Sequence, residues 1–425
     1  MIVVLFALLF LFFGLGFSIW IAMGLSGVLY ILLQGQVSLT VVASYLVQGV
    51  DSPTLIAIPF FILAGELMNK SGITRKLAEF ATYFVGGFRG GMGYVAIVVN
   101  FIMGGVSGSA VADATAVSSI LLPTMEKQGY DKPFAASINA AAAVMGPIIP
   151  PSIPMIFIGV ISGISIGKLF LGGIVPGAMI ALFLAAAVFV VSRKRRYPVV
   201  RVERSFATFA VLLRDTVFAL ITPLIIVLGV VLGVVTLVEV AALAILYILV
   251  ISLFVYKSIT FREIFSASAK AAVFSAAIMI IFAVVGVFQY ITVQEQLGDQ
   301  LQRFISSMHF TKVTFLLAVT LFYVLMGCII DAIPIMLIFF PVLLPVAVGL
   351  GVDPTHFGVI TVFNLMIGLL TPPVGALLFI ETKIANIPFG TLVRASAPYT
   401  LVLFLVLLLC VFIPDLVMFI PNLVL

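Results

Sequence analysis

Two proline-rich segments interrupt long apolar runs in this 425-residue chain, GPIIPPSIP at residues 146–154 and LTPPVG at residues 370–375. Proline lacks a backbone N–H and clashes with the preceding helical turn, so neither segment can be continuous helix. In hydrocarbon, every backbone group without a partner is costly unless protein, water or an ion satisfies it. The unwound carbonyls could coordinate a cation, while the N-terminus of the following half-helix attracts an anion. A kink or an interfacial loop is the simpler alternative for each segment.

The composition around these breaks is that of a membrane protein. Hydrophobic residues make up 64% of the chain and charged residues 9%, with a mean hydropathy of +1.37. A soluble domain carries about 25% charged residues. Long apolar runs, such as residues 1–33 and 216–256, lack the alternation of barrel strands. We therefore expect an all-α polytopic membrane protein with roughly 10 to 14 membrane elements, at about 20 apolar residues per crossing.

Basic residues indicate which side of the membrane is cytoplasmic. Six of the 21 Lys and Arg residues cluster in one loop, Arg193, Lys194, Arg195, Arg196, Arg201 and Arg204. We place this loop, about residues 193–206, in the cytoplasm, and anchoring to lipid headgroups would agree. A second basic stretch from Lys70 to Arg89 falls on the opposite face by helix counting, and residues 73–85 have the mixed character of an interfacial amphipathic helix. The net charge of +5 is not a nucleic-acid-binding signal.

The chain repeats itself at a fixed offset. Shifted by 222 residues, Pro150-Pro151 falls on Pro372-Pro373 and Gly146 falls on Gly368. The same shift aligns Leu121-Leu122-Pro123 with Leu343-Leu344-Pro345, Gly129 and Asp131 with Gly351 and Asp353, and Pro176 with Pro398. Matched prolines and glycines are less expected by chance than matched leucines. We predict two homologous halves, about 1–205 and 206–425, which are inverted if each crosses an odd number of times.

A short glycine-bearing segment with one acid precedes each break, at residues 104–113 and 326–334. The apolar stretches around them are short for two crossings, which favours re-entrant helical hairpins with tight tips of small residues. Ordinary helix packing also uses such residues, so this alternative stays open. The expected elements are hairpins at about 104–125 and 326–345, and broken helices at about 133–165 and 357–385.

The acids of these segments are Asp113 and Asp331. Intramembrane carboxylates are costly and usually functional. Each lies about ten residues before a proline expected to end its helix, Pro123 and Pro341. Cation coordination, fixation of a hairpin and capping of a half-helix all remain open as roles.

Four other polar residues lie in apolar segments. Asn139 and Asn364 precede the two breaks, where they could bind sodium through the side-chain carbonyl or hydrogen-bond to another helix. Glu66 and Glu239 are intramembrane or interfacial.

Motifs of catalysis are absent from the sequence. Residues 163–168, GISIGK, miss the Walker A spacing, so ATP hydrolysis is not expected. Cys328 and Cys410 lie in apolar segments, which argues against disulfides and Cys-ligated metals. His309 and His356 are expected in loops. We therefore expect no enzyme and no cofactor, with energy supplied by an ion gradient or a partner.

Together these motifs resemble the large membrane subunit of the tripartite ATP-independent periplasmic (TRAP) transporters. The resemblance covers nearly the whole chain and rests on IPFFILAGELM at 58–68, Ser71-Gly72, Ser107-Gly108-Ser109, IPPS at 149–152, Pro176-Gly177, TLVEVAA at 236–242, and residues 351–358 and 368–375. Two departures are Asp113, where the family often has a small neutral residue, and the absence of a proline in residues 236–239.

The resemblance implies an elevator-type transporter with a moving transport domain and a static scaffold domain. It implies a bacterial inner-membrane protein that works with a small membrane subunit and a soluble periplasmic substrate-binding protein. In this family sodium usually drives uptake of carboxylate-bearing molecules such as sialic acids or four-carbon dicarboxylates.

The resemblance also implies sodium sites at the hairpin tips and broken helices. Carried onto this chain, the sodium ligands are Ser107, Gly108, Ser109, Pro147, Pro150, Gly327, Asp331, Thr371 and Pro373. The substrate-binding candidates are Ser107, Ser109, Ser152, Asn364 and Thr371. No family-matched arginine lies in the predicted site, so half-helix N-termini and hydroxyl groups are expected to hold the carboxylate.

Other functions fit less well. A channel without coupling more often assembles symmetric rings around one pore. An intramembrane enzyme needs a convergent polar constellation, and a structural scaffold does not need two costly helix breaks.

Overall fold

The computed structural model describes residues 2–35, 37–199, 205–233 and 235–425. Within these ranges the chain forms 20 α-helices, a 3-10 turn and a π-helical turn, and no β-strand. The predicted all-α fold is confirmed. Arg201 and Arg204 of the basic loop lie outside the described residues.

The helices divide at the basic loop. Before it come α1 (Ile2–Gly14), α2 (Ile19–Gln34), α3 (Leu39–Gln48), η1 (Pro53–Ile56), α4 (Ala57–Lys70), α5 (Ile73–Val85), α6 (Gly91–Ser107), α7 (Ala110–Lys127), α8 (Lys132–Ala143), α9 (Ile153–Ser162) and α10 (Ile166–Lys194). After it come α11 (Phe206–Val231), α12 (Leu237–Val250), η2 (Ile251–Val255), α13 (Phe261–Gln294), α14 (Leu297–Ser307), α15 (Lys312–Gly327), α16 (Ala332–Gly349), α17 (Pro354–Gly368), α18 (Ala376–Ala385), α19 (Phe389–Phe412) and α20 (Asp415–Val424).

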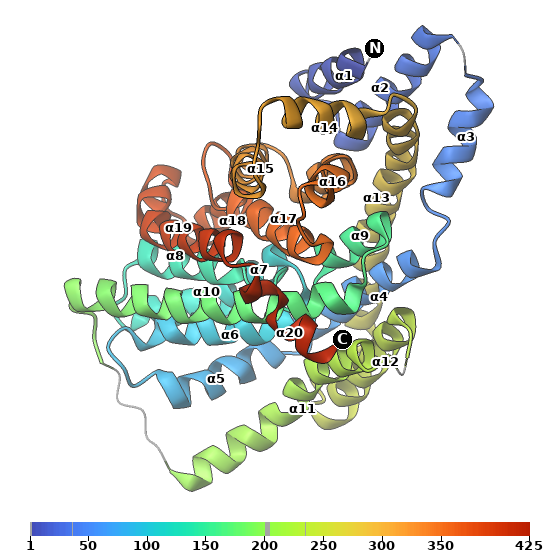
Figure 1. Ribbon diagram of the computed structural model, residues 1–425. Helices are drawn as coiled ribbons and strands as arrows, with labels where there is room; N and C mark the ends of the chain where they lie inside the picture. The colour runs from blue at the N-terminus through green and yellow to red at the C-terminus, as the bar shows by residue number, and fades with distance from the viewer. Residues whose placement is uncertain (1, 36, 200–204, 234) are drawn as a thin grey trace.

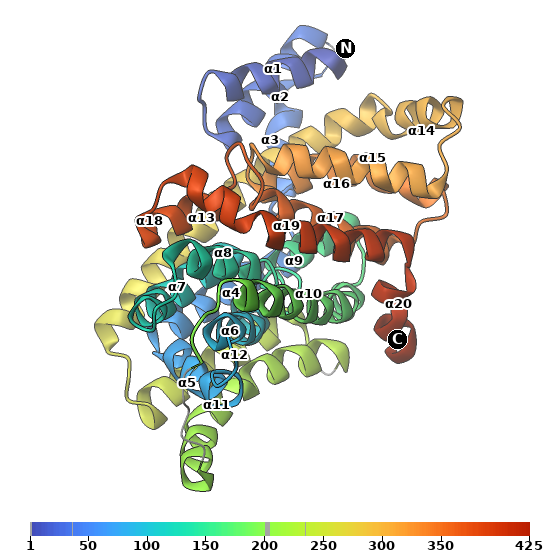
Figure 2. The ribbon, with the colours of Figure 1, turned by 90° about the vertical axis from the view of Figure 1, so that its left-hand side faces the viewer.

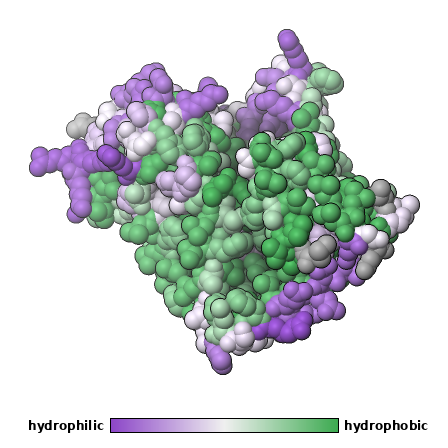
Figure 3. All heavy atoms as spheres, turned by 90° about the horizontal axis from the view of Figure 1, so that it is seen from above, coloured by the Kyte–Doolittle hydropathy of each residue, from purple (hydrophilic) through white to green (hydrophobic). Residues whose placement is uncertain are grey.

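Six helices of the described residues are long and apolar enough to cross a membrane, namely α10, α11, α12 with η2, α13, α16 and α19. A seventh span results if α3 and α4, bent by 58°, count as one. Further apolar helices have only 10–17 residues, and several of these are arms of hairpins or halves of broken helices. A hydrophobic band with hydrophilic residues at its margins covers the face shown in Figure 3. The chain is therefore a multi-pass membrane protein.

Most of the helices form two groups. The frame consists of α2, α3, α4, α12 and α13, in which α13 contacts α2, α3 and α4. The central body consists of α6–α10 and α15–α19, and α6, α8 and α10 run side by side in it (Figure 1). Helices α17 and α19 lie against α10, so elements from both halves of the chain pack in adjacent layers (Figure 2).

Each half contains one hairpin of the central body. The first runs along α6, turns at Gly108 and Ser109, and returns along α7. Gly108 takes the left-handed φ of 60° that the tight turn needs. The second runs along α15, turns over residues 328–331, and returns along α16. The hairpins are longer than the expected ranges 104–125 and 326–345, because the helical first arms begin well before each glycine-bearing tip.

Pro123 and Pro341 do not end helices, contrary to the prediction. They lie inside α7 and α16. Neighbouring helices and local adjustment can satisfy the backbone groups that an embedded proline frees in a membrane.

The Arg89 end of the second basic stretch lies on the same side as the basic loop, contrary to simple helix counting, whereas Lys70 lines the cavity at the first hairpin tip. The Tyr83 hydroxyl donates to the Ser205 carbonyl oxygen at 3.2 Å. A Cβ on Gly90 would lie 1.9 Å from Ser192 Oγ, directly before Arg193.

His356 and Glu239 lie in the first turns of α17 and α12, and the structure decides the sequence predictions for both residues. His356 is not in a loop, because Asp353 Oδ1 accepts from Thr355 N at 2.7 Å and starts α17 there. The His356 ring is buried, with Nε2 2.8 Å from the Cys410 carbonyl oxygen. Glu239 is an exposed capping residue, since its Oε2 accepts from Thr236 N at 2.7 Å.

Candidate functional site

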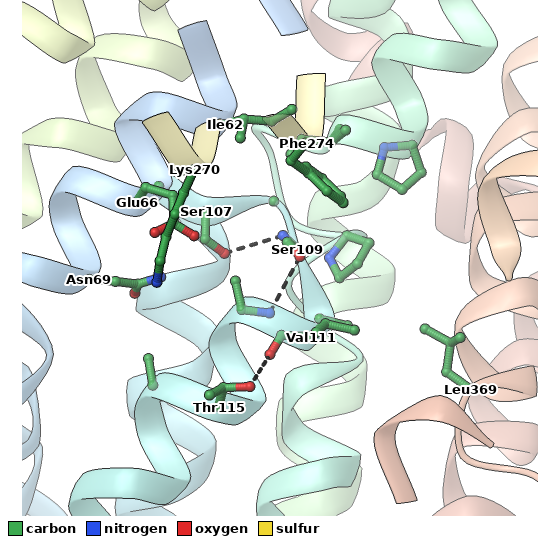
Figure 4. A pocket seen from close by; sticks show the side chains of 18 of the residues that line it. Ile62, Glu66, Asn69, Ser107, Ser109, Val111, Thr115, Lys270, Phe274 and Leu369 are labelled. Carbon is green, nitrogen blue, oxygen red and sulfur yellow. Dashed lines mark hydrogen bonds between the residues drawn. The ribbon is translucent and has the colours of Figure 1, made fainter. Parts of the chain in front are cut away.

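A cavity of about 640 Å³ opens between the frame and the central body (Figure 4). It brings together the first hairpin tip, the start of α16 and the ends of the broken helices. Five sequence-predicted residues line it, Ser107, Gly108, Ser109, Pro147 and Asp331. The frame contributes the polar side chains Glu66, Asn69, Lys70 and Lys270.

The first hairpin packs directly on the first helix break. Helix α8 ends at Ala143 and α9 begins at Ile153, which leaves residues 144–152 outside helix. A Cβ on Gly104 would lie 2.8 Å from Gly146 Cα, so the two backbones meet with no side chain between them. Small residues at this position bring the unwound segment against the hairpin tip.

Asp113 is completely buried where this hairpin meets the break. Its Oδ1 accepts a hydrogen bond of 2.5 Å from Ser107 Oγ. Its Oδ2 has no hydrogen-bond partner among the described residues. A Cβ on Gly146 would lie 2.5 Å from this free oxygen, so the oxygen faces the break. The arrangement points a carboxyl oxygen without a partner at the unwound backbone, where it could join carbonyl oxygens in holding a cation.

The second hairpin packs on the second break in the same way. Residues 369–375 separate α17 from α18. The backbone N–H groups of Val374 and Gly375 donate to the Cys328 carbonyl oxygen at 3.1 and 3.3 Å. A Cβ on Gly327 would lie 3.2 Å from Gly368 Cα. Asp331 caps α16 by accepting from Ile333 N at 3.0 Å, and it also lines the cavity.

Six candidate residues do not line the cavity, namely Pro150, Ser152, Gly327, Asn364, Thr371 and Pro373. Ser152 is buried and caps α9, since it accepts from Met155 N at 3.2 Å and donates to the Pro147 carbonyl oxygen. Thr371 Oγ1 donates to the Ile367 carbonyl oxygen at 2.8 Å. Asn364 is buried beside the second break, and neither of its amide atoms has a partner among the described residues.

Asn139 belongs to a buried polar network. Of the two roles predicted for it, the structure shows hydrogen bonding to other helices. Its Nδ2 lies 2.7 Å from Glu381 Oε1, and its Oδ1 accepts from Asn100 at 2.8 Å. Ser118 Oγ lies 2.6 Å from Glu381 Oε2. The network joins α6, α7 and α8 of the first half to α18 of the second half. Sequence reasoning missed Glu381, although an acid in an apolar helix was a usable signal.

A second cavity of about 630 Å³ lies along α7 toward the basic loop. Its lining includes Arg75, Glu79, Tyr83, Gln128 and Thr208. Ser119 and Ile120 line both cavities. The two cavities therefore meet along α7, and together they lead from the hairpin tip toward the side of the basic loop.

The sequence matches a family of known transporters. Residues 3–416 match the model of the family "Tripartite ATP-independent periplasmic transporter, DctM component".

The chain belongs to the DctM family.

Two named relatives are large permease proteins of TRAP transporters. The chain is 34% identical over 397 residues to the sialic acid TRAP transporter large permease protein SiaM of Vibrio cholerae, covering 93% of this chain and 92% of SiaM. It is 34% identical over 401 residues to the C4-dicarboxylate TRAP transporter large permease protein DctM of Pseudomonas aeruginosa, covering 94% of each. The resemblance drawn from the motifs is confirmed, and so is the assignment to transport permeases rather than enzymes.

A solved structure shares the fold of this DctM-family chain. The YdaH transporter of Alcanivorax borkumensis superposes with a TM-score of 0.62 at 13% identity, covering 88% of this chain and 87% of YdaH. At this identity the likeness concerns the fold alone, and it agrees with the helical membrane architecture.

Proposed function

We propose that the chain catalyses sodium-gradient-driven uptake of a small organic acid across a bacterial inner membrane. The observation that carries this proposal is the cavity at the first hairpin tip, where unwound backbone, hydroxyl groups and charged side chains converge. Transport families with broken helices bind substrate and coupling ions at such points. Membership in the DctM family supports the same function.

Sodium in this proposal is a transported ion that binds at two sites. The first site uses Ser107, Gly108, Ser109, Pro147 and Pro150 beside the free oxygen of Asp113. The second uses Gly327, Asp331, Thr371 and Pro373. Carbonyl and hydroxyl oxygens suit a hard cation, and unwound backbone supplies carbonyls that no helix occupies. The close backbone contacts of hairpin and break at both places support this assignment.

We assign the moving transport domain to the central body and the static scaffold to the frame. The cavity lies between these two groups of helices. Movement of one group past the other would carry a solute bound at the hairpin tip across the membrane, as alternating access requires.

The substrate belongs to the class of sialic acids or four-carbon dicarboxylates. The names of SiaM and the Pseudomonas DctM support both. A cavity of about 640 Å³ lies in the usual range for small-molecule sites, about 300–1,000 Å³. The partners are a small membrane subunit and a soluble periplasmic binding protein, and the term "large permease protein" used for relatives supports a smaller companion.

Reconstitution tests this function directly. The chain is placed in liposomes with its small subunit, and binding protein loaded with radiolabelled N-acetylneuraminate or succinate is added outside. An inward sodium gradient should drive accumulation of one of these acids, whereas an equal potassium gradient should not. Uptake that ignores sodium would favour an uncoupled channel, and uptake that needs internal ATP would reject secondary transport.

A further inference from the structure

Two lysines line the cavity, and neither belongs to the predicted set of binding residues. Lys70 ends α4 and Lys270 lies within the long span α13. Both come from the frame, whereas Ser107, Ser109 and Pro147 come from the central body. The cavity is therefore lined by cationic groups on one side and by the hairpin tip on the other.

The two lysines differ in their contacts. Lys70 Nζ donates to Ser266 Oγ at 2.9 Å. The ammonium group of Lys270 makes no hydrogen bond or ion pair with any residue that the structure describes. Its side chain extends from α13 toward Asn69 and passes Glu66 (Figure 4). Glu66 lines the same cavity, but its carboxylate oxygens lie more than 4.0 Å from Lys270 Nζ, so the two side chains form no ion pair.

Lys270 is the tenth residue of the 34-residue helix α13, is exposed and lines the cavity. A lysine that only escapes lipid would extend to the headgroup layer along its own helix. Lys270 instead lines a cavity together with the first residues of α7, Ala110 and Val111. The N-terminus of an 18-residue helix such as α7 also favours negative charge. The cavity therefore holds the ammonium groups of Lys70 and Lys270 and the N-terminus of α7 on one side of the charge balance, and the acids Glu66 and Asp331 on the other.

We infer that Lys270 binds the carboxylate of the transported acid in this cavity and makes the site selective for anions. The inference rests on the proposed function and names a specificity-determining residue for it. Asn69 and Glu66 can receive the hydroxyl or amide groups of the same solute, because they line the cavity beside Lys270. Lys270 belongs to the frame, and the hairpin tip belongs to the central body. The contact with the solute therefore forms in the conformation of this structure, in which the cavity continues toward the basic loop.

A thermodynamic cycle tests the contact. Equilibrium binding of the acid that the wild type transports, N-acetylneuraminate or succinate, is compared with binding of its neutral methyl ester, in sodium buffer and with the purified complex. Lys270→Gln should raise the Kd of the acid about tenfold, the loss expected for one charge-assisted hydrogen bond, and leave the Kd of the ester nearly unchanged. Lys270→Arg should retain most of the affinity. Lys168→Gln, which removes an exposed lysine outside both cavities, is the matched control.

Chemical rescue separates loss of charge from misfolding. Lys270→Cys is reacted with a methanethiosulfonate reagent that adds an ammonium group or with one that adds a sulfonate, and native Cys328 and Cys410 are buried. Only the ammonium reagent should restore acid binding. Equal weakening of acid and ester, or wild-type affinity in Lys270→Gln, would overturn the inference while leaving sodium-driven uptake intact. Failure of the wild type to transport either acid would instead overturn the proposed function and, with it, this assignment.

Discussion

Asp113 is the residue on which the proposed first sodium site depends. It is fully buried, and only one of its two carboxylate oxygens has a partner among the described residues. A buried polar oxygen without a hydrogen-bond partner costs about 1–3 kcal/mol. A bound cation beside Gly146 would remove that penalty. Ser107 orients the carboxylate and also accepts a hydrogen bond from Ser109 N at 3.2 Å, so the hairpin tip and the acid are held as one unit.

Substitution of Asp113 by Asn should therefore weaken sodium binding. An amide keeps the size of the side chain and can still accept from Ser107, but it lacks the negative charge. The sodium concentration for half-maximal uptake should rise about tenfold, in line with the loss of one charge-assisted contact. The measurement is uptake in proteoliposomes over a series of external sodium concentrations.

Asp415→Asn is the control for this experiment, since Asp415 is an acid at the start of α20, far along the chain from both hairpins. If Asp113→Asn shows the wild-type sodium dependence, the carboxylate is structural and the first sodium site does not include it.

At the scale of elements, each hairpin is joined to its broken helix by glycines. Gly104 meets Gly146 in the first half, and Gly327 meets Gly368 in the second. In both places the hairpin arm and the unwound segment touch through backbone atoms, which side chains would prevent. The Glu381 network adds a polar connection between the two halves, because α18 reaches α7 and α8 through it. Hairpin and break thus form one packed unit in each half.

Substitution of Gly368 by Ala should disrupt the second of these contacts. Its Cβ would lie 2.7 Å from the Gly327 backbone, so the backbone must shift. The expected loss is about 1–3 kcal/mol of stability, typical of overpacking. Thermal unfolding in detergent can be followed with a thiol-reactive dye, because Cys328 and Cys410 are buried until the protein unfolds.

Gly390→Ala provides the comparison, since no atom lies within 4 Å of its added Cβ in α19. It should leave the melting temperature unchanged or raise it slightly. Equal melting temperatures for both variants would show that the hairpin and the break are not tightly packed.

At the scale of the whole molecule, the two cavities define a direction. The first lies at the hairpin tip, and the second lies near Thr208, close after the basic loop. Arg195 pairs with Asp131 just beyond the end of α7, so this end of the hairpin is on the side of the basic loop. We expect the basic loop to face the cytoplasm, because basic residues concentrate on that side of membrane proteins. In the proposed orientation, the path along α7 leads from the hairpin-tip cavity to the cytoplasmic face.

Labelling of Ser119→Cys tests this orientation. Ser119 is exposed and lines both cavities. A membrane-impermeant thiol reagent should modify the new cysteine in inside-out vesicles and not in right-side-out vesicles. Lys168→Cys, at the opposite end of α10 from the basic loop, should show the reverse pattern. Labelling of Ser119→Cys only from the outside would contradict the assigned direction.

Local sequence chemistry identified the breaks and the tips. Proline pairs exclude continuous helix wherever they stand, so the segments around Pro150 and Pro372 were predictable without a structure. The positions of Lys270 and Glu381 were not, because each comes from a helix far along the chain whose sequence does not state which neighbour it faces. The prolines inside α7 and α16 led to a wrong prediction, since a single proline can be accommodated when neighbouring helices support it.

The sequence by itself determined that this chain is helical, lies in a membrane, repeats itself and carries two unwound segments, because hydropathy, proline chemistry and repeated spacing act on neighbouring residues. Only the tertiary structure decided which of the candidate groups share a cavity. It placed Ser107 and Asp331 with Lys270 around one space and turned Ser152 inward as a helix cap. The physical reason is that helix packing selects one face of each helix, and that selection depends on contacts between residues far apart in the chain.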